Sequence, residues 1–192
     1  MTIPDHKLIY YIQRWVELNE AEESLILDAF EPIAVKKKKD LLVPGDVCRY
    51  VYFIASGAVR SYHVDEKGVE HIFQLSLENS WISDLESFFS QKPSNYYIES
   101  IEPSTLLRIS YERLETLYAE VPKLERYFRI LFQRAYLNAL QRLNSTMWDT
   151  AEERYNDMIK ENCSILQRVP QTYIASYLGI TPESLSRIRK KK

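Results

Sequence analysis

The sequence of 192 residues is poor in glycine, cysteine and histidine. Its four glycines form no glycine-rich phosphate loop, which excludes the P-loop class of nucleotide-binding enzymes. The two cysteines, Cys48 and Cys163, are far apart and follow no CxxC pattern, so no disulfide framework, zinc site or iron–sulfur cluster is indicated. The three histidines lack the His-x-His spacing of a barrel metal centre. We therefore expect no metal, no other cofactor and no enzymatic activity.

Long apolar runs are also missing. No run approaches the roughly 18 residues that cross a bilayer, so we expect no membrane partner. The opening stretch MTIPDHKLIYYIQRW is too polar and aromatic for a signal peptide. We therefore expect a cytoplasmic protein. A content of 45% hydrophobic and 27% charged residues is ordinary for a globular chain with one large domain or two small ones.

The charge is distributed unevenly along the chain. The formal net charge is −2, but residues 168–192 contribute +5 and the remainder contributes −7. A basic terminus on an acidic body favours contact between that end and a polyanion such as DNA. A solvated basic tail explains the charge alone equally well, so the residue pattern has to decide.

The apolar pattern changes twice along the chain. Residues 7–30 have helical spacing and predict two short helices. Residues 33–109 contain short runs rich in Val, Ile, Tyr and Phe, separated by turn signals such as Ser56-Gly57, and predict an antiparallel barrel or sandwich. Residues 59–75 predict a hairpin that turns at Gly68. Strand alternation in this hairpin assigns one face to Val59, Ser61 and His63 and the other to Arg60, Tyr62 and Val64.

Past Ser110 the spacing is helical again, which makes the fold class α+β. Residues 122–147 predict one long helix with an apolar stripe that exceeds what a small barrel can cover. We expect this stripe to form a dimer seam, with packing inside the chain as the alternative. The stripe comprises Leu124, Phe128, Leu131, Ala135, Tyr136, Leu140, Leu143 and Met147.

The C-terminal stretch TYIASYLGITPESLSRIRKKK has the spacing of a helix-turn-helix. Ala175 lets the two helices approach, Gly179 accepts the left-handed backbone of a tight turn, and Leu185 fills the angle between the helices. Thr181 is a suitable N-cap, with Pro182 at the first helical position. The alternative is a helical hairpin with a solvated face.

A polar row projects outward from the second of these helices and points to DNA as the partner. Arginine pairs with guanine edges in the major groove, and glutamate accepts from cytosine. The residues that we expect to contact DNA are Glu183, Ser184, Arg187 and Lys191, together with Gln171 and Thr172 at the start of the preceding helix.

The whole chain resembles the Crp/Fnr family of bacterial transcription regulators, the cyclic-AMP receptor and fumarate-nitrate regulator group. The stretch LLVPGDVCRYVYFIASGAVRSYHVDEKGVEHIFQL is similar to the family's barrel signature, and ITPESLSRIRKKK to its recognition helix. The resemblance implies a β jelly-roll sensor of the cyclic-nucleotide-binding type in residues 1–121, a dimerisation helix in 122–147 and a winged-helix-like helix-turn-helix domain in 148–192. It also implies a homodimer on a near-palindromic operator in double-stranded DNA, with RNA polymerase as a further candidate partner.

Two departures from the family concern DNA recognition. By the resemblance, Glu183 and Arg187 fall on base-reading positions with Ser184 between them. Pro182 stands where the cyclic-AMP receptor has an arginine, so this chain lacks one of the base contacts of that protein. No stranded wing is recognisable between Ile165 and Thr172.

The effector cassette departs further from the family. In the family, a Gly-Glu pair and an arginine about eleven residues further along the chain bind the cyclic nucleotide. In this sequence, Ser83-Asp84 replaces the Gly-Glu pair. The position of the arginine falls on Ser94, which is followed by Asn95. No arginine occurs anywhere between Arg60 and Arg108.

The long helix also lacks the family's adenine contacts. Ala139 and Leu140 stand where the cyclic-AMP receptor offers hydroxyl groups to adenine. We therefore expect a regulator that does not bind cyclic AMP and whose effector is unknown. The alternatives are a sensor module that acts by protein contact and a barrel enzyme of the cupin type. Salt-dependent DNA binding would distinguish a DNA regulator from a sensor module that acts by protein contact. The metal content of the purified protein tests whether the chain is a cupin-type enzyme.

Overall fold

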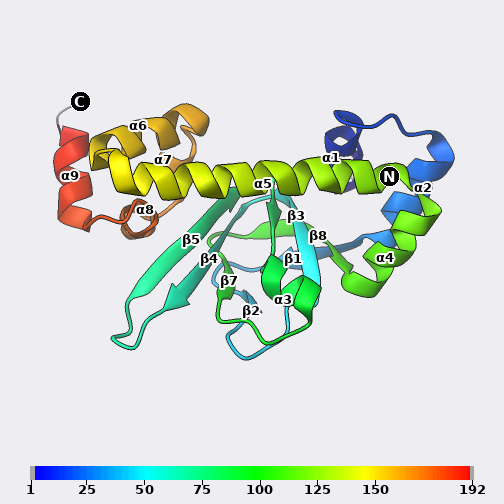
Figure 1. Ribbon diagram of the computed structural model, residues 1–192, viewed down its shortest axis with the longest axis horizontal. Helices are drawn as coiled ribbons and strands as arrows, with labels where there is room; N and C mark the ends of the chain where they lie inside the picture. The colour runs from blue at the N-terminus through cyan, green and yellow to red at the C-terminus, as the bar shows by residue number, and fades with distance from the viewer. Residues whose placement is uncertain (1–2, 191–192) are drawn as a thin grey trace. The chain divides into compact units, whose positions relative to one another are not determined.

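The computed structural model describes residues 3–190 (Figure 1). These residues form two compact units. The first contains residues 3–61 and 75–131, and the second contains residues 62–74 and 132–190. We describe each unit by itself.

The first unit carries four helices and the start of a fifth. Asn19 and Glu22 form a capping box at the start of α2, and the Ser110 hydroxyl caps α4, so local sequence fixes where both helices begin. The helices are α1 (Ile3–Gln13), α2 (Glu20–Ala29), α3 (Leu85–Ser90), α4 (Tyr111–Glu120) and the N-terminal part of α5 (Lys123–Trp148). The two short helices predicted in residues 7–30 are confirmed, whereas α3 was not predicted.

Eight strands form two four-stranded sheets, as expected from the texture of residues 33–109. The first sheet has the order β1-β8-β3-β6 and the second the order β2-β7-β4-β5. The pairings β1–β8, β3–β8, β3–β6 and β2–β7 are antiparallel. The strands are β1 (Glu31–Val35), β2 (Asp40–Leu42), β3 (Tyr50–Ser56), β4 (Ala58–Val64), β5 (Glu70–Leu77), β6 (Trp81–Ile82), β7 (Tyr97–Ser100) and β8 (Ser104–Ser110).

An aromatic cluster around Trp81 joins the first sheet to its helices. The Trp81 ring lies 5.3 Å from the ring of Phe53 and 5.4 Å from that of Phe128, centroid to centroid. Its indole Nε1 donates a 3.0 Å hydrogen bond to the hydroxyl of Tyr127, so the one polar atom of the indole is satisfied. Such edge-to-face packing of large rings stabilises the seam between β3, β6 and α5.

The turn predicted at Ser56-Gly57 is confirmed and requires glycine. Gly57 has a φ of +103°, and a Cβ there would lie 2.1 Å from Oγ of Ser104. Both the backbone conformation and the close approach of β8 therefore exclude a side chain.

The second unit is mainly helical. It contains the C-terminal part of α5, α6 (Ala151–Glu161), α7 (Ile165–Arg168), α8 (Gln171–Tyr177) and α9 (Pro182–Lys190), together with the β4–β5 hairpin segment, residues 62–74. The Thr150 hydroxyl and the Glu153 carboxylate form a capping box at the start of α6. The buried apolar residues of the second unit are Tyr62, Ile72, Tyr155, Met158, Ile165, Val169, Ile174, Ala175, Leu178, Leu185 and Ile188.

The β4–β5 hairpin turns at Gly68, as predicted, with a φ of +80°. Its burial departs from simple alternation, because residues 58–62 are all buried, including Arg60, Ser61 and Tyr62. Arg60 is 2% exposed and donates a 3.1 Å hydrogen bond to Glu99, which pairs its charge.

Within residues 3–190, no helix is long and apolar enough to cross a membrane.

Candidate DNA interface and degenerate effector cassette

Helices α8 and α9 form the predicted helix-turn-helix. Gly179 has a φ of +67° in the turn, and the Ile180 N–H donates a 3.0 Å hydrogen bond to the carbonyl of Ala175. Ala175 is fully buried, and Leu185 is 1% exposed. The small residue, the left-handed turn and the filling leucine therefore have the roles that their spacing predicted.

The start of α9 is capped as predicted. The Thr181 hydroxyl oxygen accepts a 3.2 Å hydrogen bond from the backbone N–H of Ser184, and Pro182 is the first helical residue. Hydrogen bonding to its own backbone N–H, followed by the Thr181 hydroxyl and the charge of Arg187, lowers the pKa of Glu183. Glu183 is therefore a carboxylate at neutral pH and can accept hydrogen bonds.

The polar row of α9 lies on the side opposite its buried Leu185 and Ile188. Glu183 and Arg187 are exposed and Ser184 is half-buried, with Nη2 of Arg187 donating a 3.3 Å hydrogen bond to Oγ of Ser184. These three side chains are therefore neighbours on one helical face. Gln171 and Thr172 are exposed at the start of α8. Lys191 lies outside the described residues.

A hydrogen-bonded cluster holds α8 against the hairpin segment. Ser176 Oγ donates a 2.8 Å hydrogen bond to the carbonyl of Glu70 and accepts a 3.0 Å bond from the N–H of Ile72. One serine hydroxyl on α8 therefore satisfies two backbone groups of β5.

Arg142 on α5 completes this cluster, which we call the Arg142 brace and define as Arg142, Ser176, Tyr177 and residues 70–73. Its guanidinium donates to the carbonyls of Ile72 (3.1 Å), Tyr177 (3.0 Å) and Phe73. Its Cζ lies 4.0 Å from the centre of the Tyr177 ring. Burial lowers the pKa of Arg142, yet the group remains charged because the ordinary value is so high. Arg142 was not among the predicted site residues, because nothing in its local sequence pattern marks it.

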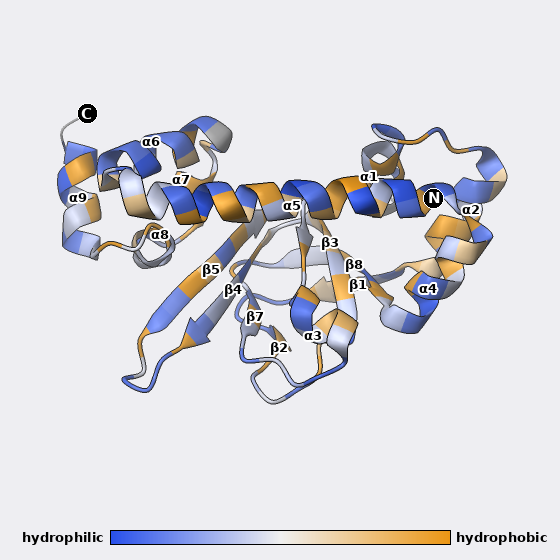
Figure 2. Cartoon of the chain, viewed as in Figure 1, coloured by the Kyte–Doolittle hydropathy of each residue, from blue (hydrophilic) through white to orange (hydrophobic). Residues whose placement is uncertain are grey.

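The C-terminal part of α5 exposes a row of large apolar side chains. In Figure 2, hydrophobic and hydrophilic residues alternate along this helix. Leu143 is 59% exposed and Met147 is 68% exposed, although both belong to the predicted stripe. Leu124 and Phe128, at the N-terminal end of the same stripe, are buried within the first unit. The exposed residues are Tyr136, Leu137, Leu140, Leu143, Met147 and Trp148. Ala139 and Leu140, the positions expected to face an adenine, are both exposed on this helix.

The cassette residues of the first unit bond to one another. Ser94 Oγ donates a 2.6 Å hydrogen bond to Oδ2 of Asp84, and Oδ1 of Asp84 accepts from the N–H of Ser87 at 3.3 Å. Asp84 is therefore the N-cap of α3, and both of its carboxylate oxygens are used.

Ser94 is further tied to the loop between β2 and β3. Its N–H donates to the carbonyl of Asp46 at 2.8 Å, its carbonyl accepts from Gly45 at 2.9 Å, and its Oγ accepts from the N–H of Tyr96 at 2.9 Å. The side chain is 3% exposed, whereas the neighbouring Asn95 is exposed. The structure thus brings Ser94 and Asp84 together.

Ser83 faces the same loop. Its Oγ donates a 3.2 Å hydrogen bond to the carbonyl of Tyr50 and lies 3.3 Å from Sγ of Cys48. Burial raises the pKa of the Cys48 thiol, so the sulfur is protonated at neutral pH. Cys48 has the structural role expected for a buried thiol.

Comparison with known proteins finds one matching domain family and several related regulators. Residues 32–121 match the model of the cyclic nucleotide-binding domain. The fumarate and nitrate reduction regulatory protein of Vibrio cholerae is 28% identical over 187 residues, which cover 89% of this chain and 72% of that protein. This relative is a regulatory protein and not an enzyme, in agreement with the prediction of no enzymatic activity.

Two solved structures share the fold. FixK2 from Bradyrhizobium japonicum is 19% identical with a TM-score of 0.72, covering 84% of this chain and 83% of that chain. CLP of Xanthomonas campestris, a c-di-GMP-responsive global regulator, is 16% identical with a TM-score of 0.70, covering 90% of this chain and 91% of that chain. The chain therefore shares its fold with these two solved structures.

Proposed function

We propose that the chain is a transcription regulator of the Crp/Fnr type, a homodimer that binds a specific, near-palindromic sequence in double-stranded DNA. Its matches to the cyclic nucleotide-binding domain and to a fumarate and nitrate reduction regulatory protein support this proposal. We assign sensing to residues 1–121, dimerisation to residues 122–147 and DNA binding to residues 148–192. The function of each part is argued from its own residues.

The observation that carries the proposal is the outward row of α9. Glu183 and Arg187 are exposed on one face, while Leu185 and Ile188 anchor the opposite face in the core of the second unit. Arginine offers two parallel donors to guanine, and a carboxylate accepts from the amino group of cytosine. A helix that packs one face in the core and exposes a carboxylate and a guanidinium on the opposite face is suited to contacting base edges in a major groove.

Dimerisation is supported by the exposed apolar row on the C-terminal part of α5. Tyr136, Leu140, Leu143 and Met147 recur at spacings of four, three and four, so they share one helical face. Water-exposed leucine and methionine in such a row favour burial against a second copy of the same helix. A two-fold dimer would present two α9 helices to half-sites about one DNA turn apart, roughly 34 Å.

We further propose that the sensor barrel does not bind cyclic AMP. A cyclic phosphate taken out of water needs a charge-assisted donor to replace its hydration. Ser94 stands at the arginine position, and its hydroxyl proton is already committed to Asp84. The carboxylate of Asp84, which lies within hydrogen-bond distance of Ser94, would repel the phosphate.

DNA fragments selected from the source genome provide the test of DNA binding. The fragments bound by the full chain are identified, and affinity for the enriched sequence is measured by fluorescence anisotropy between about 50 and 200 mM salt. We expect a near-palindrome, and an affinity that falls steeply with salt because lysine and arginine displace counterions from phosphates. A chain ending at Gly179 serves as the control. Equal affinity of the full and shortened chains for every duplex would instead favour a sensor that acts by protein contact.

A further inference from the structure

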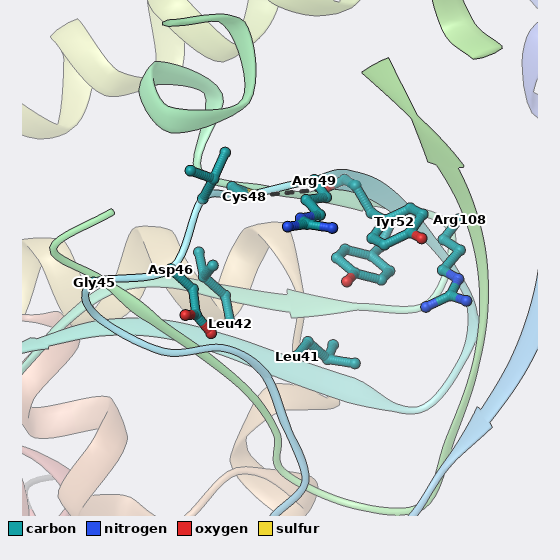
Figure 3. Close-up of a pocket in the computed structure, with 10 residues that line it drawn as sticks. Leu41, Leu42, Gly45, Asp46, Cys48, Arg49, Tyr52 and Arg108 are labelled. Carbon is teal, nitrogen blue, oxygen red and sulfur yellow. Dashed lines mark hydrogen bonds between the residues drawn. The ribbon is translucent and has the colours of Figure 1, made fainter. Parts of the chain in front are cut away.

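A cavity of about 500 Å³ opens beside the cassette in the first unit (Figure 3). It is lined by β2, by the loop between β2 and β3, and by side chains of β3 and β8. None of Ser83, Asp84, Ser94 and Asn95 belongs to its lining. Cavities of about 300–1,000 Å³ commonly bind small molecules, so this one has a suitable size.

Tyr52 supplies an unsatisfied donor in the wall of this cavity. The residue is only 4% exposed, and within residues 3–190 no group forms a hydrogen bond with its hydroxyl. The Tyr52 hydroxyl is not among the buried polar atoms without a partner, so it is accessible from the cavity, and an acceptor on a ligand can take its hydrogen bond without breaking one inside the protein. Burial raises the pKa of Tyr52, so the hydroxyl stays protonated and can donate.

Two arginines stand on either side of Tyr52 in the cavity (Figure 3). Arg108 donates two 2.9 Å hydrogen bonds to the carboxylate of Glu31 and lies 4.3 Å from the centre of the Tyr50 ring, so its charge is matched. Arg49 is exposed and makes no ion pair or hydrogen bond in the described part of the chain. Its guanidinium is therefore available to an anion.

The remaining lining limits the charge and shape of a ligand. Asp46 contributes one carboxylate, which disfavours a doubly charged anion such as phosphate. Leu41, Leu42 and Val47 contribute apolar surface. The site thus offers one free cation, one neutral donor and an apolar wall.

We propose that this cavity binds a small monocarboxylic acid with an apolar or aromatic body, whose carboxylate meets Arg49 and the Tyr52 hydroxyl. The cavity is separate from the cassette that stands at the family's cyclic-nucleotide site, and the proposal does not depend on DNA binding. Benzoate and hexanoate are suitable probes, because each pairs one carboxylate with an apolar body that is small relative to the cavity.

The test is titration of the full chain with benzoate and with hexanoate, followed by calorimetry and by NMR shifts of the β2–β3 loop. Benzyl alcohol and inorganic phosphate are the comparison ligands. We expect saturable binding of at least one acid with a dissociation constant of about 1 mM or below, and binding at least tenfold weaker for benzyl alcohol and phosphate. Absence of saturable binding of both acids up to about 10 mM overturns the proposal, as does equal or tighter binding of phosphate.

Two variants identify the site. Tyr52→Phe removes only the hydroxyl, and Arg49→Gln removes the free charge; each should weaken acid binding about tenfold. Tyr10→Phe and Arg126→Gln change exposed residues outside the cavity and should leave binding unchanged. Because the Tyr52 hydroxyl and the Arg49 guanidinium have no partner to lose, thermal unfolding should match the wild type for both variants. Binding that neither Tyr52→Phe nor Arg49→Gln weakens would show that the acid binds elsewhere and would overturn the assignment.

Discussion

Ser94 Oγ donates a 2.6 Å hydrogen bond to the carboxylate of Asp84, so these two residues, which the sequence resemblance predicts at the phosphate- and ribose-binding positions, satisfy each other. Neither residue therefore needs a ligand to complete its hydrogen bonding. A nucleotide would have to break this bond and also bring its phosphate close to a carboxylate.

The first prediction is that cyclic AMP and cyclic GMP do not bind. Calorimetry of the full chain should show no saturable heat up to millimolar concentration of either nucleotide, because the cassette contains no arginine that could replace the water of the phosphate. Operator affinity should be the same with and without each nucleotide. Saturable binding near micromolar concentration would contradict this reading of the cassette.

The second prediction concerns the stability that the same bond provides. Ser94→Ala should lower the free energy of unfolding by about 1–2 kcal/mol, because Asp84 and the N–H of Tyr96 each lose a partner in a largely buried position. Ser186→Ala, on the exposed side of α9, is the matched control and should change stability by less than about 0.5 kcal/mol. Urea unfolding of both variants measures the difference.

The third prediction concerns base recognition by α9. Arg187→Ala should weaken binding to the selected operator by about 1–3 kcal/mol and relax the preference at one base pair of each half-site. Lys191→Ala should instead weaken binding to all sequences alike and flatten the salt dependence. Arg126→Ala, an exposed arginine on the part of α5 in the first unit, is the control that should do neither. Anisotropy titrations against the operator and its single-base variants distinguish these outcomes.

The fourth prediction concerns the dimer. Leu143→Glu places a charge in the exposed apolar row and should produce monomers that also lose operator binding. Gln141→Glu adds the same charge at a nearby exposed position that lies outside the apolar row, and should leave the dimer intact. Sedimentation at micromolar concentration measures the assembly. A monomeric wild type at that concentration would disprove the proposed seam.

The fifth prediction concerns the Arg142 brace. Arg142→Met should destabilise the second unit by about 2–4 kcal/mol, because three backbone carbonyls lose a charged donor. Arg142→Lys should recover little of this loss, since an ammonium lacks the planar fork that serves several carbonyls and stacks on Tyr177. Hydrogen exchange of α8 and of residues 70–73 should speed up in both variants, while Gln141→Ala leaves it unchanged. Unchanged exchange in Arg142→Met would show that the brace does not hold these elements together.

The sequence alone determined the features that depend on neighbouring residues. The left-handed turn at Gly179 needs a residue without a Cβ, the Thr181 cap needs a hydroxyl three residues before the N–H that it accepts, and the anchoring of Leu185 follows from helical periodicity. The hairpin turn at Gly68 has the same local character. Such features could be predicted because their causes lie within a few residues of one another.

Only the tertiary structure decided the contacts that join distant segments. Arg142 reaches carbonyls 69 and 70 residues away, and Ser94 meets Asp84 across the whole length of α3, so no local pattern marks either pair. Arg60 was assigned to a strand face but not to the buried pair with Glu99, because burial on both faces of β4 depends on what packs there. The cavity at Tyr52 likewise exists only because the β2–β3 loop folds over β3 and β8. Periodicity shows which side of a helix or strand is apolar. Packing between residues that are far apart in the chain decides which partner covers that side and which polar atom is left without a partner.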